Sequence, residues 1–227
     1  MSRNLSRLFL SAFVIIAAFA VPVQAEMPAT GKSNYVVKRD GTPIGTLKIS
    51  FARDGDRLVA TSDYSIKIKL LAIVLYRYDK RMVETYENGR LVAYQTDIDD
   101  NGTKSQVRVT RDGENLAIVH PKGKLTAPVG IYPSTYWPTA TPGLTQMIDS
   151  SDGILLNVKT AETATEDLAI DGRTVKTKRY AMSGDVEREI WYTADTGAWL
   201  KLKMSASDNS TIEIERDWAP VWKRDLL

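Results

Sequence analysis

The chain has 227 residues, no cysteine, 30 Lys and Arg residues and 28 Asp and Glu residues. The absence of cysteine excludes disulfide bonds, a Cys–His nucleophile and a cysteine-ligated metal. Two basic residues, Arg3 and Arg7, fall in an expected signal peptide, which leaves 28 basic against 28 acidic residues. A neutral chain lacks the basic excess that nucleic-acid binding needs and the net charge that attracts a protein to an anionic membrane.

Residues 1–25 have the three parts of a secretory signal peptide. Basic residues come first, an apolar run of 13 residues follows from Leu8 to Ala20, and Val23 and Ala25 are the small residues expected at a cleavage site. The apolar run is shorter than the about 20 residues that span a bilayer. We therefore expect a periplasmic protein, cleaved after Ala25 and without a membrane span after cleavage.

Beyond the signal peptide we expect a flexible segment, residues 26–33, and a single antiparallel β domain, residues 34–227. Leu47, Ile49 and Phe51 share one face, with polar residues between them. This period of two is typical of a strand with one buried face. The same alternation recurs at Leu58–Leu70, Val107/Val109, Leu116/Ile118, Ile190/Tyr192, Leu200/Leu202/Met204 and Ile212/Ile214.

Asp-Gly and Asn-Gly pairs, such as Asp40-Gly41 and Asn88-Gly89, separate the alternating runs. These pairs favour tight hairpin turns, which make consecutive strands antiparallel neighbours. The sequence thus predicts a mostly β fold, a single antiparallel meander of about ten to twelve strands. With little helix to cover the apolar face, the sheet is expected to curl into a barrel or half-barrel. Charges in mid-strand, such as Lys48 and Asp63, disfavour a lipid-facing transmembrane barrel.

Two segments break the pattern. Residues 70–76 (LLAIVLY) are continuously apolar, which suits a strand buried on both faces, a short plug or an exposed lipid-facing tip; we favour burial. Residues 127–151 carry four prolines and cannot form a regular central strand. This segment is predicted to be the single short helical, proline-rich crossover, with one or two helical turns in residues 143–149.

A curled sheet of this size predicts a partly open apolar interior that binds a lipid-like ligand, although a fully packed barrel is an alternative. Tyr132, Tyr136 and Trp137, an aromatic cluster between prolines, are candidates for the lip of the cavity or for a cap on the core. The candidates for lining the cavity are Phe51, Tyr64, Ile66, Ile68, Leu70, Leu200, Leu202 and Met204.

Nothing in the sequence indicates catalysis, a metal or a cofactor. His120 is the single histidine, and no Gly-x-Ser-x-Gly elbow accompanies it. Asp97–Gly102 begins like a calcium loop, but Arg108 stands where the ion needs a carboxylate, so that we expect a hairpin turn. Acidic residues are plentiful, but no spacing singles out a catalytic pair.

Four segments of the chain are distinctive in combination: Tyr35–Gly45, Lys69–Tyr78, Pro133–Trp137 and Ile190–Tyr192. Together they resemble an uncharacterised family of proteobacterial periplasmic proteins, a domain of unknown function. The resemblance covers nearly all of the chain after the signal peptide and implies no active-site residues. The expected architecture is also distantly similar to the half-barrels of bacterial lipoprotein carriers, although the helical covering is thinner here.

These features predict a non-enzymatic periplasmic protein that binds an apolar or lipid-like ligand inside a curved sheet. Two alternatives stay open at this point. One is an envelope interaction or assembly protein that binds an envelope partner through a sheet edge. The other is a hydrolase that uses carboxylates.

Overall fold

The computed structural model describes residues 30–71 and 73–218, and the expected signal peptide lies outside them. The described chain is almost entirely strand, with one 3-10 helix, η1 (Thr141–Gly143). The strands are β1 (Gly31–Arg39), β2 (Thr42–Asp54), β3 (Arg57–Leu70), β4 (Ile73–Glu87), β5 (Arg90–Asp100), β6 (Thr103–Asp112), β7 (Asn115–His120), β8 (Gly123–Pro128), β9 (Tyr132–Pro133), β10 (Gln146–Ile148), β11 (Leu155–Ile170), β12 (Arg173–Gly184), β13 (Arg188–Thr193), β14 (Trp199–Ser205) and β15 (Thr211–Asp217).

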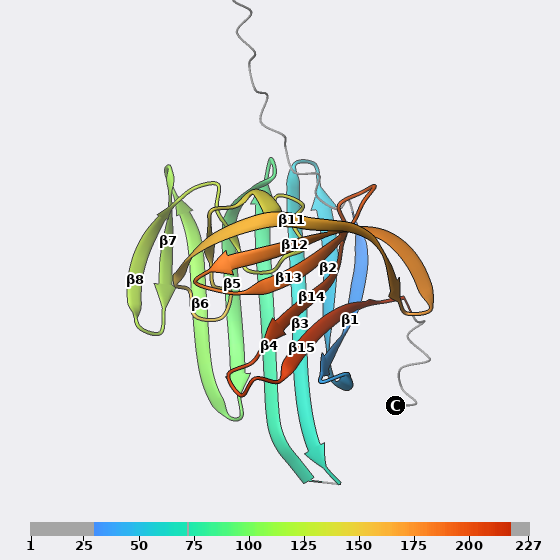
Figure 1. Ribbon diagram of the computed structural model, residues 1–227. Helices are drawn as coiled ribbons and strands as arrows, with labels where there is room; N and C mark the ends of the chain where they lie inside the picture. Colours follow the sequence, from blue (N-terminus) through green and yellow to red (C-terminus); the bar gives the residue numbers. More distant parts are fainter. Residues whose placement is uncertain (1–29, 72, 219–227) are drawn as a thin grey trace, which may run out of the picture.

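All fifteen described strands belong to one sheet in the order β8-β7-β6-β5-β4-β3-β2-β1-β15-β14-β13-β12-β11-β10-β9. Strand β1 therefore lies mid-sheet, between β2 and β15, the last of the described strands. In Figure 1 strands β11–β14 pass in front of β4–β6, because the sheet curls back over its own face. The predicted antiparallel, mostly β class is confirmed, and the sheet is not closed into a barrel.

The sheet differs from the expected meander in the number of strands and in the residue at which the first strand begins. The described residues form fifteen strands, more than the expected ten to twelve. Two of the additional strands, β9 and β10, are two and three residues long, form inside the proline-rich crossover and pair in parallel. At the other end of the domain, β1 already begins at Gly31, which pairs with Phe51 of β2. Residues 31–33, expected in the flexible segment, are thus part of the sheet.

The turns have the predicted geometry. Asp40 and Gly41 have φ values of 48° and 79°, and Asn88 and Gly89 have 50° and 74°. Two consecutive residues with positive φ are the signature of the type I′ turn, whose twist matches that of a hairpin. The calcium-like segment is also a hairpin turn, in which Asp99 accepts a hydrogen bond from the amide of Gly102.

Apolar and polar residues alternate along the strands, so the sheet has an apolar inner face and a charged outer face. The hydrophobic core gathers residues of both halves of the sheet, including Ile49 of β2 and Leu202 of β14. On the outer face, Lys201 lies 2.7 Å from carboxylate oxygens of both Glu213 and Glu215. The inner face of the curled sheet is therefore where an apolar site is to be sought.

The crossover, residues 129–154, runs from one sheet edge to the other and packs against the inner face. The Tyr132 hydroxyl donates to the carbonyl of Gly89, and the Tyr192 hydroxyl donates to the carbonyl of Tyr136. As predicted, this segment contains no regular central strand. Its helical part is shorter than expected and earlier, at Thr141–Gly143, because residues 146–148 pair with β11 instead.

The favoured interpretation of residues 70–76 as a buried strand is wrong. Leu71 is 94% exposed, and Leu70, Ile73, Val74 and Leu75 are also exposed. These residues form the tip of the β3–β4 hairpin, which extends beyond the rest of the sheet at the bottom of Figure 1. Among the described residues, no helix is long and apolar enough to cross a membrane.

The close pairing of β2 and β3 requires glycine at position 45. A Cβ atom there would lie 2.1 Å from the carbonyl oxygen of Ser65 and 2.9 Å from Cα of Ile66, both backbone atoms. We expect Gly45→Ala to lower the free energy of unfolding by about 1–3 kcal/mol in urea denaturation. Gly143→Ala is the matched control, because nothing lies within 4 Å of its Cβ position. Equal stability of the two variants would contradict this account.

Candidate functional site

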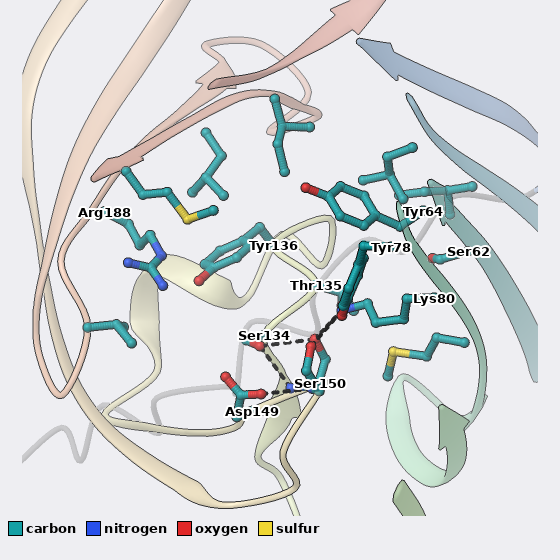
Figure 2. Close-up of a pocket in the computed structure, with 18 of the residues that line it drawn as sticks. Ser62, Tyr64, Tyr78, Lys80, Ser134, Thr135, Tyr136, Asp149, Ser150 and Arg188 are labelled. Carbon is teal, nitrogen blue, oxygen red and sulfur yellow. Dashed lines mark hydrogen bonds between the residues drawn. The ribbon is translucent and has the colours of Figure 1, made fainter. Parts of the chain in front are cut away.

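A cavity of about 340 Å³ lies on the inner face of the sheet. Its walls come from β2, β3 and β4 on one side and from β14 and β15 on the other, so that the curl of the sheet creates it. The crossover supplies a third side through residues 134–136 and 149–151. Figure 2 shows the arrangement, with Tyr64, Tyr78 and Tyr136 around the interior. This volume is within the range of small-molecule sites, roughly 300–1,000 Å³.

Several of the residues predicted to line a cavity do so. Tyr64, Ile66, Leu202 and Met204 lie on its walls, and Tyr136 of the predicted lip faces it from the crossover. Their positions follow from strand parity, which places every second residue of β3 and β14 on the inner face. The side chains that meet here come from strands more than 100 positions apart in the sequence.

Two further candidates from the strands are buried but do not line the cavity. Phe51 lies further along β2, where its ring meets the ring of Trp137 edge-on at 5.0 Å. Leu200 is the extra residue of a β-bulge, since Trp191 pairs with Lys201 and Tyr192 pairs with Trp199. The bulge shifts the parity of β14, and Trp199 takes the inner position that the sequence assigned to Leu200.

The remaining candidates also lie outside the cavity walls. Tyr132 and Trp137 are buried against Tyr86, at ring-centre distances of 5.9 and 5.3 Å, and thus cap the core. Of the three lip candidates, only Tyr136 lines the cavity. Ile68 and Leu70 have the parity of the cavity-lining Ile66, but they belong to the part of β3 that extends past its pairing with β2 and are not on the cavity wall.

One side of the otherwise apolar cavity is polar and carries a half-buried cation, Lys80. The Nζ atom of Lys80 donates to the hydroxyls of Ser150 and Ser151, at 2.9 and 3.2 Å. Burial lowers the pKa of Lys80, while the carboxylates of Asp149 and Glu84 oppose that shift. A half-buried ammonium group held by two hydroxyls retains the capacity to bind an anion, and pairing with an anion would offset its partial desolvation.

A buried ionisable group, Glu84, lies behind this wall. Its carboxylate accepts hydrogen bonds from the Tyr86 hydroxyl, from Trp137 Nε1 at 3.1 Å and from the Thr135 hydroxyl at 3.4 Å. Burial raises the pKa of Glu84 to about 7, against the opposing effect of these hydrogen bonds and of Lys80. Glu84 does not line the cavity; it joins the crossover to β4.

Arg188 brings a second cation to the cavity wall, and Figure 2 shows it across the view from Lys80. Its Nε atom is buried and has no hydrogen-bond partner among the described residues, as is also true of the Ser62 hydroxyl. Buried polar atoms in proteins are nearly always hydrogen-bonded. Two such atoms on the walls of one cavity are what a site for a partly polar ligand would contain.

The residue pattern did not single out Lys80, Glu84, Asp149 or Arg188 as site residues. The signal for two of them was present, since Lys80 and Glu84 have the same parity on β4 as the buried Met82. A charged residue at an inward position of an alternating strand is costly unless it is paired or functional. Asp149 and Arg188 had no such signal, because the course of the crossover and of the β12–β13 loop decides where they lie.

Among the described residues, no group of three or more His, Asp or Glu side chains is arranged to hold a metal ion. Asp149 is the one carboxylate among the described residues on the cavity wall, and its Oδ1 accepts hydrogen bonds from the amides of Ser151 and Asp152. It therefore shapes the turn that carries Ser150 and Ser151.

Comparison with known proteins gives a family and a fold. Residues 35–217 match the domain described as "Domain of unknown function (DUF6134)". No curated protein matches the chain. Among solved structures, the chain is similar to a beta-barrel-like protein of domain of unknown function DUF1849 from Brucella abortus. The TM-score is 0.61 and the identity 7%, over 83% of this chain and 96% of that one. At this identity the likeness shows the fold alone.

Proposed function

Because this chain belongs to the DUF6134 family, whose function is unknown, we propose its role from the cavity: it binds an amphiphile with an apolar chain and an anionic head group. The observation that carries the proposal is the half-buried Lys80, held by two serine hydroxyls at the polar side of an apolar cavity. Leu47, Ile66 and Leu202 would contact the apolar chain of the ligand, and Lys80 with Arg188 would hold its head group. We further propose that the protein is exported to the periplasm and is not an enzyme.

The chemistry of the site supports an anionic head group over a neutral one. Lys80 and Arg188 bring two positive charges to the cavity wall and Asp149 brings one negative charge, which leaves a net positive interior. Asp149 is already engaged by backbone amides. A carboxylate or phosphate monoester entering the cavity would gain charge-assisted hydrogen bonds that an alcohol lacks.

The alternatives are less well supported. A retaining or inverting hydrolase needs two facing carboxyl groups, whereas the described cavity wall carries one, Asp149. Partner binding by strand addition needs a long open edge, whereas the two edge strands are β8, six residues ending in Pro128, and the two-residue β9, ending in Pro133. Short, proline-bearing edges are typical of sheets that resist strand addition.

The proposal is tested by calorimetric titration of the delipidated protein with laurate and with dodecanol. These two ligands have alkyl chains of the same length and differ in the head group. We expect Lys80→Met to weaken laurate binding about tenfold or more, because a hydrogen bond to a charged group contributes about 1.5–3 kcal/mol. Dodecanol binding should be unchanged. Lys48→Met, on the exposed outer face of β2, is the matched control and should leave both affinities unchanged.

Two results would overturn parts of the proposal. If the unaltered protein binds neither ligand, the cavity does not bind amphiphiles. If Lys80→Met weakens laurate and dodecanol equally, Lys80 supports the wall and does not recognise the head group.

A further inference from the structure

The β3–β4 hairpin extends past both neighbouring strands as a two-stranded ribbon, described over residues 67–71 and 73–77. The last residue of β3 paired with β2 is Ile66, and the last residue of β4 paired with β5 is Tyr78. Beyond these, β3 and β4 pair only with each other, ending with Leu70 opposite Ile73. Four such cross-strand pairs at about 3.3 Å per residue make a projection of about 13 Å.

Exposed apolar side chains are concentrated at the end of this ribbon. Leu70, Leu71, Ile73, Val74 and Leu75 are 48–94% exposed. Among the described residues, the other large apolar side chains exposed to a comparable degree are two single ones in distant segments. Single exposed apolar residues are ordinary, whereas a contiguous cluster on a projection marks an interaction site.

The backbone conformation of the tip also indicates an interaction site. Leu71 has a φ of 55°, the left-handed region that Gly, Asn and Asp occupy with least strain. The other hairpins of the sheet place such residues at their turns, for example Asn88 and Asn101. A leucine that is both strained and 94% exposed gains nothing from the folded chain alone, and an apolar partner would account for it.

The charges around the tip are positive. The ribbon contains Lys67, Lys69 and Arg77, all exposed, and no acidic residue among residues 67–77. The nearest carboxylates, Asp79 and Asp100, lie at its base; Asp79 pairs with Arg77, and Asp100 lies beside Tyr76. Although the chain as a whole is near neutral, the charge of the tip itself complements an anionic surface.

We infer that the β3–β4 hairpin docks this protein on an anionic phospholipid bilayer. The apolar tip enters the boundary between head groups and acyl chains, which peripheral proteins reach to a depth of about 5–10 Å, within the length of the ribbon. Lys67, Lys69 and Arg77 then lie at the level of the head-group phosphates. Tyr76, half-buried between the tip and the sheet, stands where aromatic residues are enriched at membrane interfaces.

Docking in this way would place the cavity beside the bilayer, a consequence that rests on the proposed function. Ile66 lines the cavity, and Ile68 and Leu70 follow it at the same parity towards the tip. On β4, Tyr76 and Tyr78 also line the cavity. The inner face of the ribbon is therefore an apolar path from the membrane to the interior of the sheet.

The experiment uses the chain from Glu26 onward, which retains every described strand and lacks the apolar run of the expected signal peptide. The chain has no cysteine, so that Leu75→Cys carries an environment-sensitive fluorophore at the tip alone. We expect its emission to shift to shorter wavelength on vesicles of phosphatidylglycerol and phosphatidylcholine. The same label at Val119→Cys, exposed on β7, should not respond.

Partition coefficients for these vesicles measure how much the apolar and the basic residues of the tip each contribute to membrane binding. We expect Leu71→Ser with Ile73→Ser to lower the partition coefficient at least tenfold, and Lys67→Ser with Lys69→Ser to lower it about tenfold at low salt, with no effect at high salt. Matched controls are Val119→Ser with Ile154→Ser, and Lys122→Ser with Lys124→Ser in the β7–β8 hairpin, which should partition like the unaltered protein.

An unshifted tip label, or equal partition of tip and control variants, would overturn the inference. So would equal binding to vesicles of phosphatidylcholine alone. If the fluorophore at the tip already emits at a shorter wavelength than the Val119→Cys label when no vesicles are present, and the protein has a dimeric mass, the tip binds a second copy of the chain instead. Laurate affinity should be unchanged in the tip variants, so that a protein that binds vesicles but no laurate would refute the proposed function and leave this inference standing.

Discussion

Trp137→Ala is expected to lower the free energy of unfolding by about 3–5 kcal/mol, the range for truncating a buried tryptophan. The Trp137 ring is 4% exposed and meets the rings of Phe51 and Tyr86 edge-on, at 5.0 and 5.3 Å. Its Nε1 also donates to Glu84. Removing the indole therefore opens a void in the core and takes one hydrogen bond from a buried carboxylate. Urea denaturation of the variant and the unaltered protein measures the difference.

Trp137→Phe separates the two contributions, because it keeps an aromatic ring against Phe51 and Tyr86 but loses the donor to Glu84. We expect the free energy of unfolding of this variant to fall by about 1–3 kcal/mol, which is less than for Trp137→Ala. This is the cost of a missing hydrogen bond to a buried group. If Trp137→Ala costs under about 1 kcal/mol, the crossover is not anchored through this residue and the cavity wall that it forms is held by other contacts.

The alternation of apolar and polar residues predicted most of the fold, because it indicates directly which side chains of a strand face the core. The inner positions of Leu47, Ile49 and Leu202 follow from it, as do the turns at Asp-Gly and Asn-Gly pairs. It failed at residues 70–76, where a continuous apolar run fits a buried strand and an exposed hairpin equally. What decides between them is that β2 and β5 stop pairing at Ile66 and Tyr78, and no local pattern encodes where a neighbouring strand ends.

The candidate site was predictable only in its apolar part. Parity placed Tyr64, Ile66 and Met204 on the cavity wall, but it could not foresee the bulge that exchanges Leu200 for Trp199. The polar part depends on the crossover, which brings Ser150 and Ser151 to Lys80 across 70 positions of sequence. Contacts of that range arise from the curl of the whole sheet, which a window of residues does not contain.

The second large effect is a pH dependence of stability caused by Glu84. Burial raises the pKa of Glu84 from 4.5 to about 7 in the folded protein. Between these values the folded state holds a proton that the unfolded state has released, so that stability falls as pH rises through this window. Below it both states are protonated, and above it both are ionised and the loss is complete. The shift corresponds to about 3 kcal/mol.

Glu84→Gln abolishes the titration and keeps one acceptor oxygen, which replaces either the Oε1 atom that accepts from Trp137 or the Oε2 atom that accepts from Tyr86. The lost hydrogen bond lowers stability by an amount that does not vary with pH, so the pH trend still reports the titration of Glu84. The stability of this variant relative to the unaltered protein is expected to rise by about 3 kcal/mol between about pH 4.5 and about pH 8, as measured by urea denaturation at each pH. Glu87→Gln, an exposed position on the same strand, should show no such trend. A constant difference between Glu84→Gln and the unaltered protein would mean that Glu84 stays ionised throughout. In that case Lys80 and the three donors outweigh its burial, and Lys80 would already be neutralised without an anionic ligand.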